Sequence, residues 1–300
     1  MPGQNTLIRA ADFNAIQAKV SINFSTGTGD QGYGQSLSSS QVAVGDRITV
    51  AQWSNLRTDM LKARQHQTGV DESGSLTLPL NTLLVTEALR AQYDSYATTI
   101  NANRFTIANN QGSLETLRTD TRTAAWNGTI TNTITVTFSD ADQARYFFNA
   151  GGNLQVSAAL SGGSGGSKYN TWTTMFSQSG SIILNYNSTI SNGSSPGTVN
   201  SRGYYNLSTT DQTIYSKPAP SGVYAENDWY ITARTASGGA QVIFTLRFED
   251  NDAGDQQGGY LPGPAVDENI DGTFTNTLQA FRPSGSNVSV AAPSVTSTGI

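Results

Sequence analysis

The sequence predicts an α+β protein that is mainly β, with a helical N-terminal segment followed by an antiparallel β-sandwich-like domain that carries short helical insertions. Apolar residues recur at helical spacing in the first third, and from about residue 128 they alternate at every second position. A chain of 300 residues is long enough for one large domain or two ordinary ones. We divide it into a helical, loop-rich segment (1–110), a β-rich domain (111–282) and an extended C-terminal tail (283–300).

Two short amphipathic helices are expected near the N-terminus. Asp12 is positioned to cap the first, and Thr49 with Gln52 makes a capping box that starts the second. Residues 51–56 also echo residues 11–16, which indicates a small internal duplication. The apolar faces carry Phe13, Ile16 and Val20 in the first helix, and Trp53, Leu56 and Met60 in the second.

A third helix is expected from about Thr82 to Asn103, with Asn81 as its cap and a broad apolar face that includes Tyr93 and Ile100. The segments 24–40 and 67–80 between the helices are rich in Gly and Ser. They are long for loops of a compact domain, so we expect them to be ordered by something outside the chain.

The strands of the β-rich domain are predicted from alternating apolar residues. We expect them at 130–138, 154–160, 182–186, 229–233, 242–248, 272–281 and 288–290, with a tight turn at PSGSN (283–287) before the last.

Two short helices are predicted between strands. Ser139 is expected to cap the first, whose aromatic residues close the end of a sheet, and Gly151 with Gly152 would end it in left-handed conformations. Asn170 would cap the second, whose packing residues are Trp172, Met175 and Phe176, and Gly180 would end it.

The composition limits the possible functions. Charged residues make up 13%, against about 25% in typical soluble domains, and the net charge is −5. Without clustered Lys and Arg, nucleic acid is not an expected partner. The chain has no cysteine, the N-terminus lacks the pattern of a secretory signal, and no run approaches the ~18 apolar residues of a membrane span.

Catalytic and metal-binding patterns are weak, so we expect neither an enzyme nor a cofactor. The only histidine, His66, has no nucleophile turn to work with and is expected to be a hydrogen-bonded residue at a helix end. Asp267, Asn269 and Asp271 match the first half of a calcium loop, but Leu278 stands where a bidentate Glu belongs. A second acidic stretch holds Asp250, Asp252 and Asp255 and is a weaker candidate.

Aromatic residues gather in the C-terminal half and leave one alternative function open. Amphipathic aromatic side chains suit stacking on sugars. A fibre-like adhesin that binds host surface glycans could therefore use Tyr204, Tyr205, Tyr215 and Tyr224, near Trp229.

Several strings resemble virion structural proteins of tailed bacteriophages, notably those that infect marine cyanobacteria. They are TGTGDQGYGQSLSS, ITVAQWSNLRTDMLKARQHQTG, ARYFFNAGGNLQVSAALSGG with TWTTMFSQSG and IILNY, DENIDGTFTNTLQAFRPSG, and NVSVAAPS. The resemblance covers most of the chain in order. It implies a structural virion component and brings no catalytic motif with it.

We therefore expect a non-enzymatic structural subunit of a phage tail, baseplate or neck, assembled in the host cytoplasm and located in the virion. Its partners would be other virion proteins and copies of itself, without nucleic acid or membrane. The helical segment would dock onto the particle, with Phe13, Ile16, Trp53, Leu56 and Met60 as candidates for the assembly interface. Of these, Trp53, Leu56 and Met60 would bury either against the third helix or against a partner. The C-terminal tail is short of large apolar residues, so we expect neighbouring copies or other virion proteins to hold it.

Overall fold

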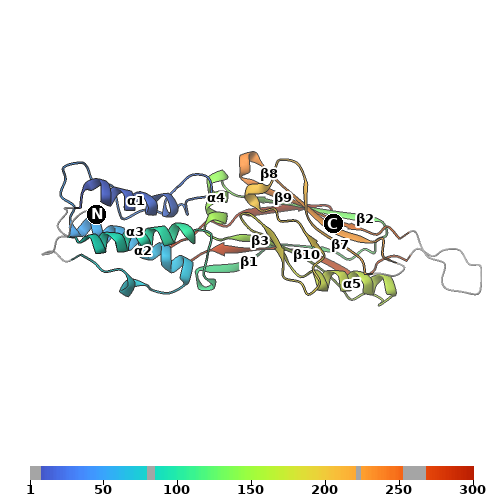
Figure 1. Ribbon diagram of the computed structural model, residues 1–300. Helices are drawn as coiled ribbons and strands as arrows, with labels where there is room; N and C mark the ends of the chain where they lie inside the picture. Colours follow the sequence, from blue (N-terminus) through green and yellow to red (C-terminus); the bar gives the residue numbers. More distant parts are fainter. Residues whose placement is uncertain (1–7, 80–84, 221–223, 253–267) are drawn as a thin grey trace, which may run out of the picture. The chain divides into compact units, whose positions relative to one another are not determined.

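The chain forms two compact units in a computed structural model that describes residues 8–79, 85–220, 224–252 and 268–300 (Figure 1). The first unit consists of residues 1–113, 142–152 and 282–291, and the second of residues 114–141, 153–281 and 292–300. This interlaced arrangement replaces the linear division at residues 110 and 282. The predicted fold class is confirmed, since helices dominate the first unit and antiparallel sheets the second.

Three helices pack together in the first unit: α1 (Ala10–Phe24), α2 (Val50–Thr68) and α3 (Glu87–Ala102) (Figure 1). The capping box of α2 is confirmed, because the Thr49 N–H donates to the Gln52 side chain at 2.6 Å. Asp12 is not the cap of α1. The helix begins at Ala10, and the Asp12 carboxylate accepts the Arg9 N–H at 3.0 Å from the third helical position.

The described part of α3 starts after Thr86, whose side chain accepts the Leu89 N–H. The predicted start at Thr82 and the predicted cap Asn81 lie outside the described residues. Short 3-10 turns at Ser73–Ser75 and Asn109–Gln111 complete the connections of this unit.

Helix α4 (Ala141–Asn149) belongs with the helical unit from Asp142 onward, and the closure of a sheet end by its aromatic residues stays a prediction. It begins one residue later than a Ser139 cap implies, so that Asp140 directly precedes it. At its end, Gly151 adopts a φ of +82°, while Gly152 is not left-handed, which corrects the expectation for the pair. The backbone N–H groups of Gly151 and Gly152 donate to the carbonyls of Phe148 and Phe147.

The second unit is a sandwich of two sheets, which are drawn in Figure 1. One sheet has the order β1-β10-β3-β4-β5 and the other β11-β2-β9-β8-β7-β6. The strand bounds are β1 Gly112–Arg122, β2 Thr129–Thr137, β3 Asn153–Ser161, β4 Ile182–Leu184, β5 Thr189–Ser191, β6 Thr198–Val199, β7 Gln212–Pro218, β8 Asp228–Ala236, β9 Gln241–Glu249, β10 Thr273–Pro283 and β11 Ser294–Thr298.

Aromatic side chains join the two sheets. The rings of Phe248 in β9 and Phe274 in β10 lie 4.6 Å apart, edge to face, and Trp229 stacks on Phe248 at 5.7 Å. Helix α5 (Ser167–Ser179) inserts Phe176 against both Phe248 and Phe274. The expected packing of Trp172, Met175 and Phe176 is confirmed, because all three side chains are buried.

Helix α5 begins three residues before the predicted cap. Gly166 precedes its first residue, and the Asn170 side chain donates from inside the first turn to the Gly165 carbonyl at 2.7 Å. Gly180 ends the helix with a φ of +62°, as predicted.

The C-terminal residues are part of both units instead of forming a separate tail. Residues 282–291 belong to the helical unit, and β11 pairs antiparallel with β2, so the chain itself holds this segment. The turn at residues 283–287 is present, but the strand predicted at residues 288–290 is only an isolated bridge between Ser284 and Ser289.

Candidate functional site

The five residues expected at an assembly interface form the core of the helical unit. Their side chains, Phe13, Ile16, Trp53, Leu56 and Met60, are all at most 1% exposed. The Trp53 ring meets the rings of Phe13 at 5.2 Å and Tyr93 at 4.7 Å, both edge to face. Of the two possibilities, burial against the third helix is therefore correct, and these residues offer no surface to a partner.

The long loop after α1 is held by this chain and does not need an outside partner. The fully buried Asp59 carboxylate accepts the backbone N–H groups of Ser38 and Ser39, at 2.9 and 2.7 Å. The Tyr33 ring is buried in the same unit, and its hydroxyl donates to the Arg104 carbonyl at 2.7 Å. Hydrogen bonds to the carboxylate and the burial of Tyr33 together fix the loop.

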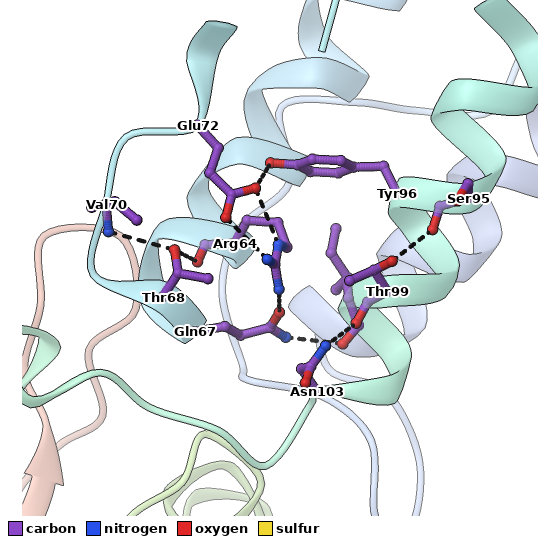
Figure 2. Close-up of polar contacts among 10 residues, drawn as sticks. Arg64, Gln67, Thr68, Val70, Glu72, Ser95, Tyr96, Thr99 and Asn103 are labelled. Carbon is purple, nitrogen blue, oxygen red and sulfur yellow. Dashed lines mark hydrogen bonds and ion pairs between the residues drawn. The ribbon is translucent and has the colours of Figure 1, made fainter. Parts of the chain in front are cut away.

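The loop after α2 is fixed by a polar network around Glu72 (Figure 2). The Arg64 guanidinium binds both Glu72 oxygens, at 3.3 and 3.0 Å, and the Tyr96 hydroxyl donates to the same carboxylate at 2.7 Å. Burial by itself raises the pKa of Glu72, but the hydrogen bonds from Tyr96 and Arg64 outweigh it and hold this pKa below its usual range. Gln67 extends the network, because its amide donates to the Ile100 carbonyl of α3 at 2.9 Å.

His66 is buried and hydrogen-bonded, as expected for a structural residue. Its Nε2 lies 2.9 Å from the Ala150 carbonyl, which can only accept, so Nε2 carries the proton. Nδ1 has no hydrogen-bond partner among the described residues. Burial lowers the pKa of His66 to about 4, and the ring is neutral at pH 7.

Two of the four tyrosines proposed for glycan binding are buried. The Tyr215 hydroxyl donates to Ser179 at 2.5 Å, and the Tyr204 hydroxyl donates to the Gly239 carbonyl at 2.9 Å. Tyr205 packs edge to face on Tyr204. Tyr224 is partly exposed and lies 3.4 Å from the Glu268 carboxylate. The nearby Trp229 is fully buried, so these residues do not form a shared stacking surface.

Among the residues that the structure describes, the side chains of the half calcium motif do not point to a common site for an ion. Asp271 accepts the Ser164 backbone N–H with both oxygens, at 3.1 and 2.9 Å, while Asn269 is exposed. Asp267 and Asp255 lie outside the described residues. Within the described ranges, no group of three or more His, Asp or Glu side chains is arranged to hold a metal.

The most unusual polar cluster is a buried lysine with two aspartates in the second unit. The Lys168 Nζ lies 2.7 Å from Asp250 Oδ2 and 3.2 Å from Asp252 Oδ2, and all three side chains are at most 3% exposed. The same nitrogen donates to the Glu268 carbonyl at 2.8 Å. Burial of charges is costly unless they are paired, so this cluster needs a physical explanation.

The surrounding backbone holds the two aspartates in place. They directly follow β9, and the buried Asn227 side chain accepts the N–H groups of Asn251 at 2.8 Å and Asp252 at 3.1 Å. The Asp250 N–H donates to the Gly128 carbonyl at 3.3 Å. Both carboxylates are therefore fixed by the fold.

Sequence reasoning picked out the two aspartates only as part of a weak metal candidate, and it missed the lysine. Lys168 stands one turn before Trp172 on α5, so it shares the face that enters the aromatic core. A lysine on the apolar face of an amphipathic helix is the signal that could have located this cluster.

No helix in the described ranges is both long enough and apolar enough to cross a membrane.

Comparisons with known proteins do not assign a family. Models of known protein families gave no match to the chain, and neither curated proteins nor solved structures gave one.

Proposed function

We propose that this chain is a non-enzymatic structural subunit of a tailed-phage virion, in its tail, baseplate or neck, which acts through contacts with other virion proteins and with copies of itself. The observation that carries the proposal is the interlacing of the two units. The chain passes from one unit to the other after residues 113, 141, 152, 281 and 291, which makes five covalent connections.

Interlacing suits a part that carries mechanical load. Domains joined by a single linker move relative to each other by default. Here each unit is built from three segments that are distant in the sequence, so pulling one segment out of its unit unfolds that unit. Resistance to forced unfolding depends on the rate of unfolding, and we expect the interlaced chain to unfold slowly.

The composition and the resemblance support the same role. The low charged fraction of 13% suits broad uncharged contact surfaces. The strings that resemble virion proteins of marine cyanophages extend over both units. Since the expected interface residues are core residues, the assembly contacts of this proposal come from the exposed surfaces of the units.

The experiment is to follow the chain through purification of particles of the phage that encodes it. Peptides of the chain should sediment with infectious particles, at a constant ratio to the major capsid protein across the gradient. Antibody labelling in electron microscopy should then place it at the tail, baseplate or neck. If the chain is abundant in the infected lysate but absent from the particles, the proposal is wrong.

A second measurement distinguishes the adhesin alternative. The purified chain should not bind host cells, because two of the four candidate tyrosines are buried. Binding that host polysaccharide competes away, together with labelling at the distal ends of fibres, would favour an adhesin over the structural subunit.

A further inference from the structure

We propose that Lys168 and Asp250 condense to an intramolecular isopeptide bond in the folded second unit, with Asp252 as the residue that transfers the protons. This inference is independent of the virion role, since it depends only on the buried cluster. The Lys168 Nζ is at hydrogen-bond distance from both carboxylates, which is the arrangement that precedes condensation.

The geometry assigns different roles to the two aspartates. Asp250 is nearer, with its Oδ2 2.7 Å from Nζ, so its Cγ is the carbon that the amine attacks. Asp252 Oδ2 lies 3.2 Å from the same nitrogen, within reach of its protons. The Lys168 Nζ donates a third hydrogen bond, to the Glu268 carbonyl at 2.8 Å, which orients the nitrogen between the two carboxylates.

The reaction balances without any further reactant. Asp252 takes one proton from the Lys168 ammonium and passes it to an Asp250 oxygen, so the free amine attacks Cγ of a neutral carboxyl group. Asp252 then takes a second proton from the nitrogen and passes it to the same oxygen, which leaves as water. The product is a neutral amide, one water molecule is released, and Asp252 ends as the carboxylate that it was at the start.

Burial supplies both the proximity and the driving force. Fixed groups at contact distance react as if at very high concentration, and Asn227 fixes the segment that carries both aspartates. A desolvated ion pair is costly in a protein interior, whereas a neutral amide is much less so. Trp172 follows Lys168 by one helical turn, Phe248 precedes Asp250 by two residues, and their rings lie 6.4 Å apart, so the flanking side chains are apolar.

The alternative is an ordinary buried ion pair that never reacts. The two differ in covalent mass, which no folding effect can imitate. The intact mass of the full chain, purified and then denatured in guanidinium chloride, should be lower than the mass of its sequence by one water molecule.

Digestion with trypsin identifies the bond. Trypsin cuts after Arg145 and Arg202 on either side of Lys168, and after Arg247 before Asp250. It does not cut after Arg282, because Pro283 follows, and no Lys or Arg stands beyond it. The linked product is residues 146–202, uncut after Lys168, joined to residues 248–300. A cyclic imide also loses water but joins no two peptides, so the linked product excludes it.

Variants separate the roles of the residues. Lys168→Met, Asp250→Ala and Asp252→Asn should each restore the full mass, and Lys217→Met is the matched control. Lys217 is a second buried lysine of this unit, and its Nζ donates to the Ser195 carbonyl, so its variant should still lose one water. A wild-type chain with the full sequence mass, cleaved by trypsin after Lys168, overturns the proposal. A link to Asp252 overturns the assignment of roles.

Discussion

The surroundings of His66 make the stability of the helical unit depend on pH. Burial lowers the pKa of the imidazole from 6.5 to about 4, so the unfolded chain takes up a proton at a higher pH than the folded chain. The free energy of unfolding should therefore be unaffected by this group above pH 6.5, and should fall as the pH decreases from 6.5 to 4, by about 3 kcal/mol in total.

The matched control for this prediction is His66→Gln, which keeps an N–H donor for the Ala150 carbonyl but does not titrate. Denaturant unfolding of both proteins between pH 4 and 8 isolates the histidine, because every carboxylate is common to the two. The fall in stability should be steeper in the wild type. If the free energy of unfolding fell in parallel with pH in the two proteins, the imidazole ring would be in contact with solvent in the folded state.

Phe147 tests the packing of α4 at the level of one side chain. Its ring is fully buried and lies 5.0 Å from the Phe148 ring, edge to face. Phe147→Ala should lower the free energy of unfolding by roughly 3–5 kcal/mol, since it leaves a cavity in a packed site. Val70→Ala is the control, because Val70 is 58% exposed and its variant should change stability by less than about 0.5 kcal/mol.

At the scale of elements, α4 is attached to the loop after α1 through backbone groups. The Arg145 guanidinium donates to the carbonyls of Gly29 and Gln31, at 2.8 and 3.1 Å. Gly34 lies against the Tyr146 ring, and a Cβ there would come within 2.4 Å of it. The loop and the helix therefore fit only because Gly34 has no side chain.

Two glycines of this loop make a matched pair of variants. Gly29→Ala and Gly34→Ala both place a side chain at positive φ, +57° and +71°, which costs about 1–2 kcal/mol. A Cβ at Gly29 meets nothing within 4 Å, whereas at Gly34 it meets Tyr146. Gly34→Ala should therefore destabilise the protein by roughly 1–3 kcal/mol more than Gly29→Ala in denaturant unfolding. Equal losses would mean that α4 moves away from the loop at no cost.

Elements that depend on local chemistry could be predicted from the sequence, and those that depend on distant partners could not. The capping box at Thr49 and the alternation in β2 are local patterns, and both are present. Strand β11 has few large apolar residues and exists because β2 offers it a partner 157 residues earlier, since Ser294 pairs with Thr137. The buried Lys168 was missed for the same reason, because its aspartates lie about 80 residues further along the chain.

At the scale of the whole molecule, the interlacing could not be predicted from the sequence, because each unit is completed by segments that are distant along the chain. The helical core includes Ala150 and Val288 beside residues of α1, α2 and α3. His66 contacts the Ala150 carbonyl at 2.9 Å, and the Asn287 side chain donates to Gln65 at 2.7 Å. The N-terminal third is therefore incomplete without two later segments of the chain.

This incompleteness predicts the behaviour of a fragment. Residues 1–113 alone lack α4 and residues 282–291, which leaves part of their core uncovered and the loop after α1 without its contacts to Arg145. The fragment should show weak near-UV circular dichroism from Trp53 and no cooperative thermal transition. Residues 1–113, 142–152 and 282–291 joined by flexible Gly/Ser linkers should recover both signals, because the missing segments are restored. A fragment 1–113 that unfolds cooperatively with the spectrum of the joined chain would show that the N-terminal third folds as an independent segment.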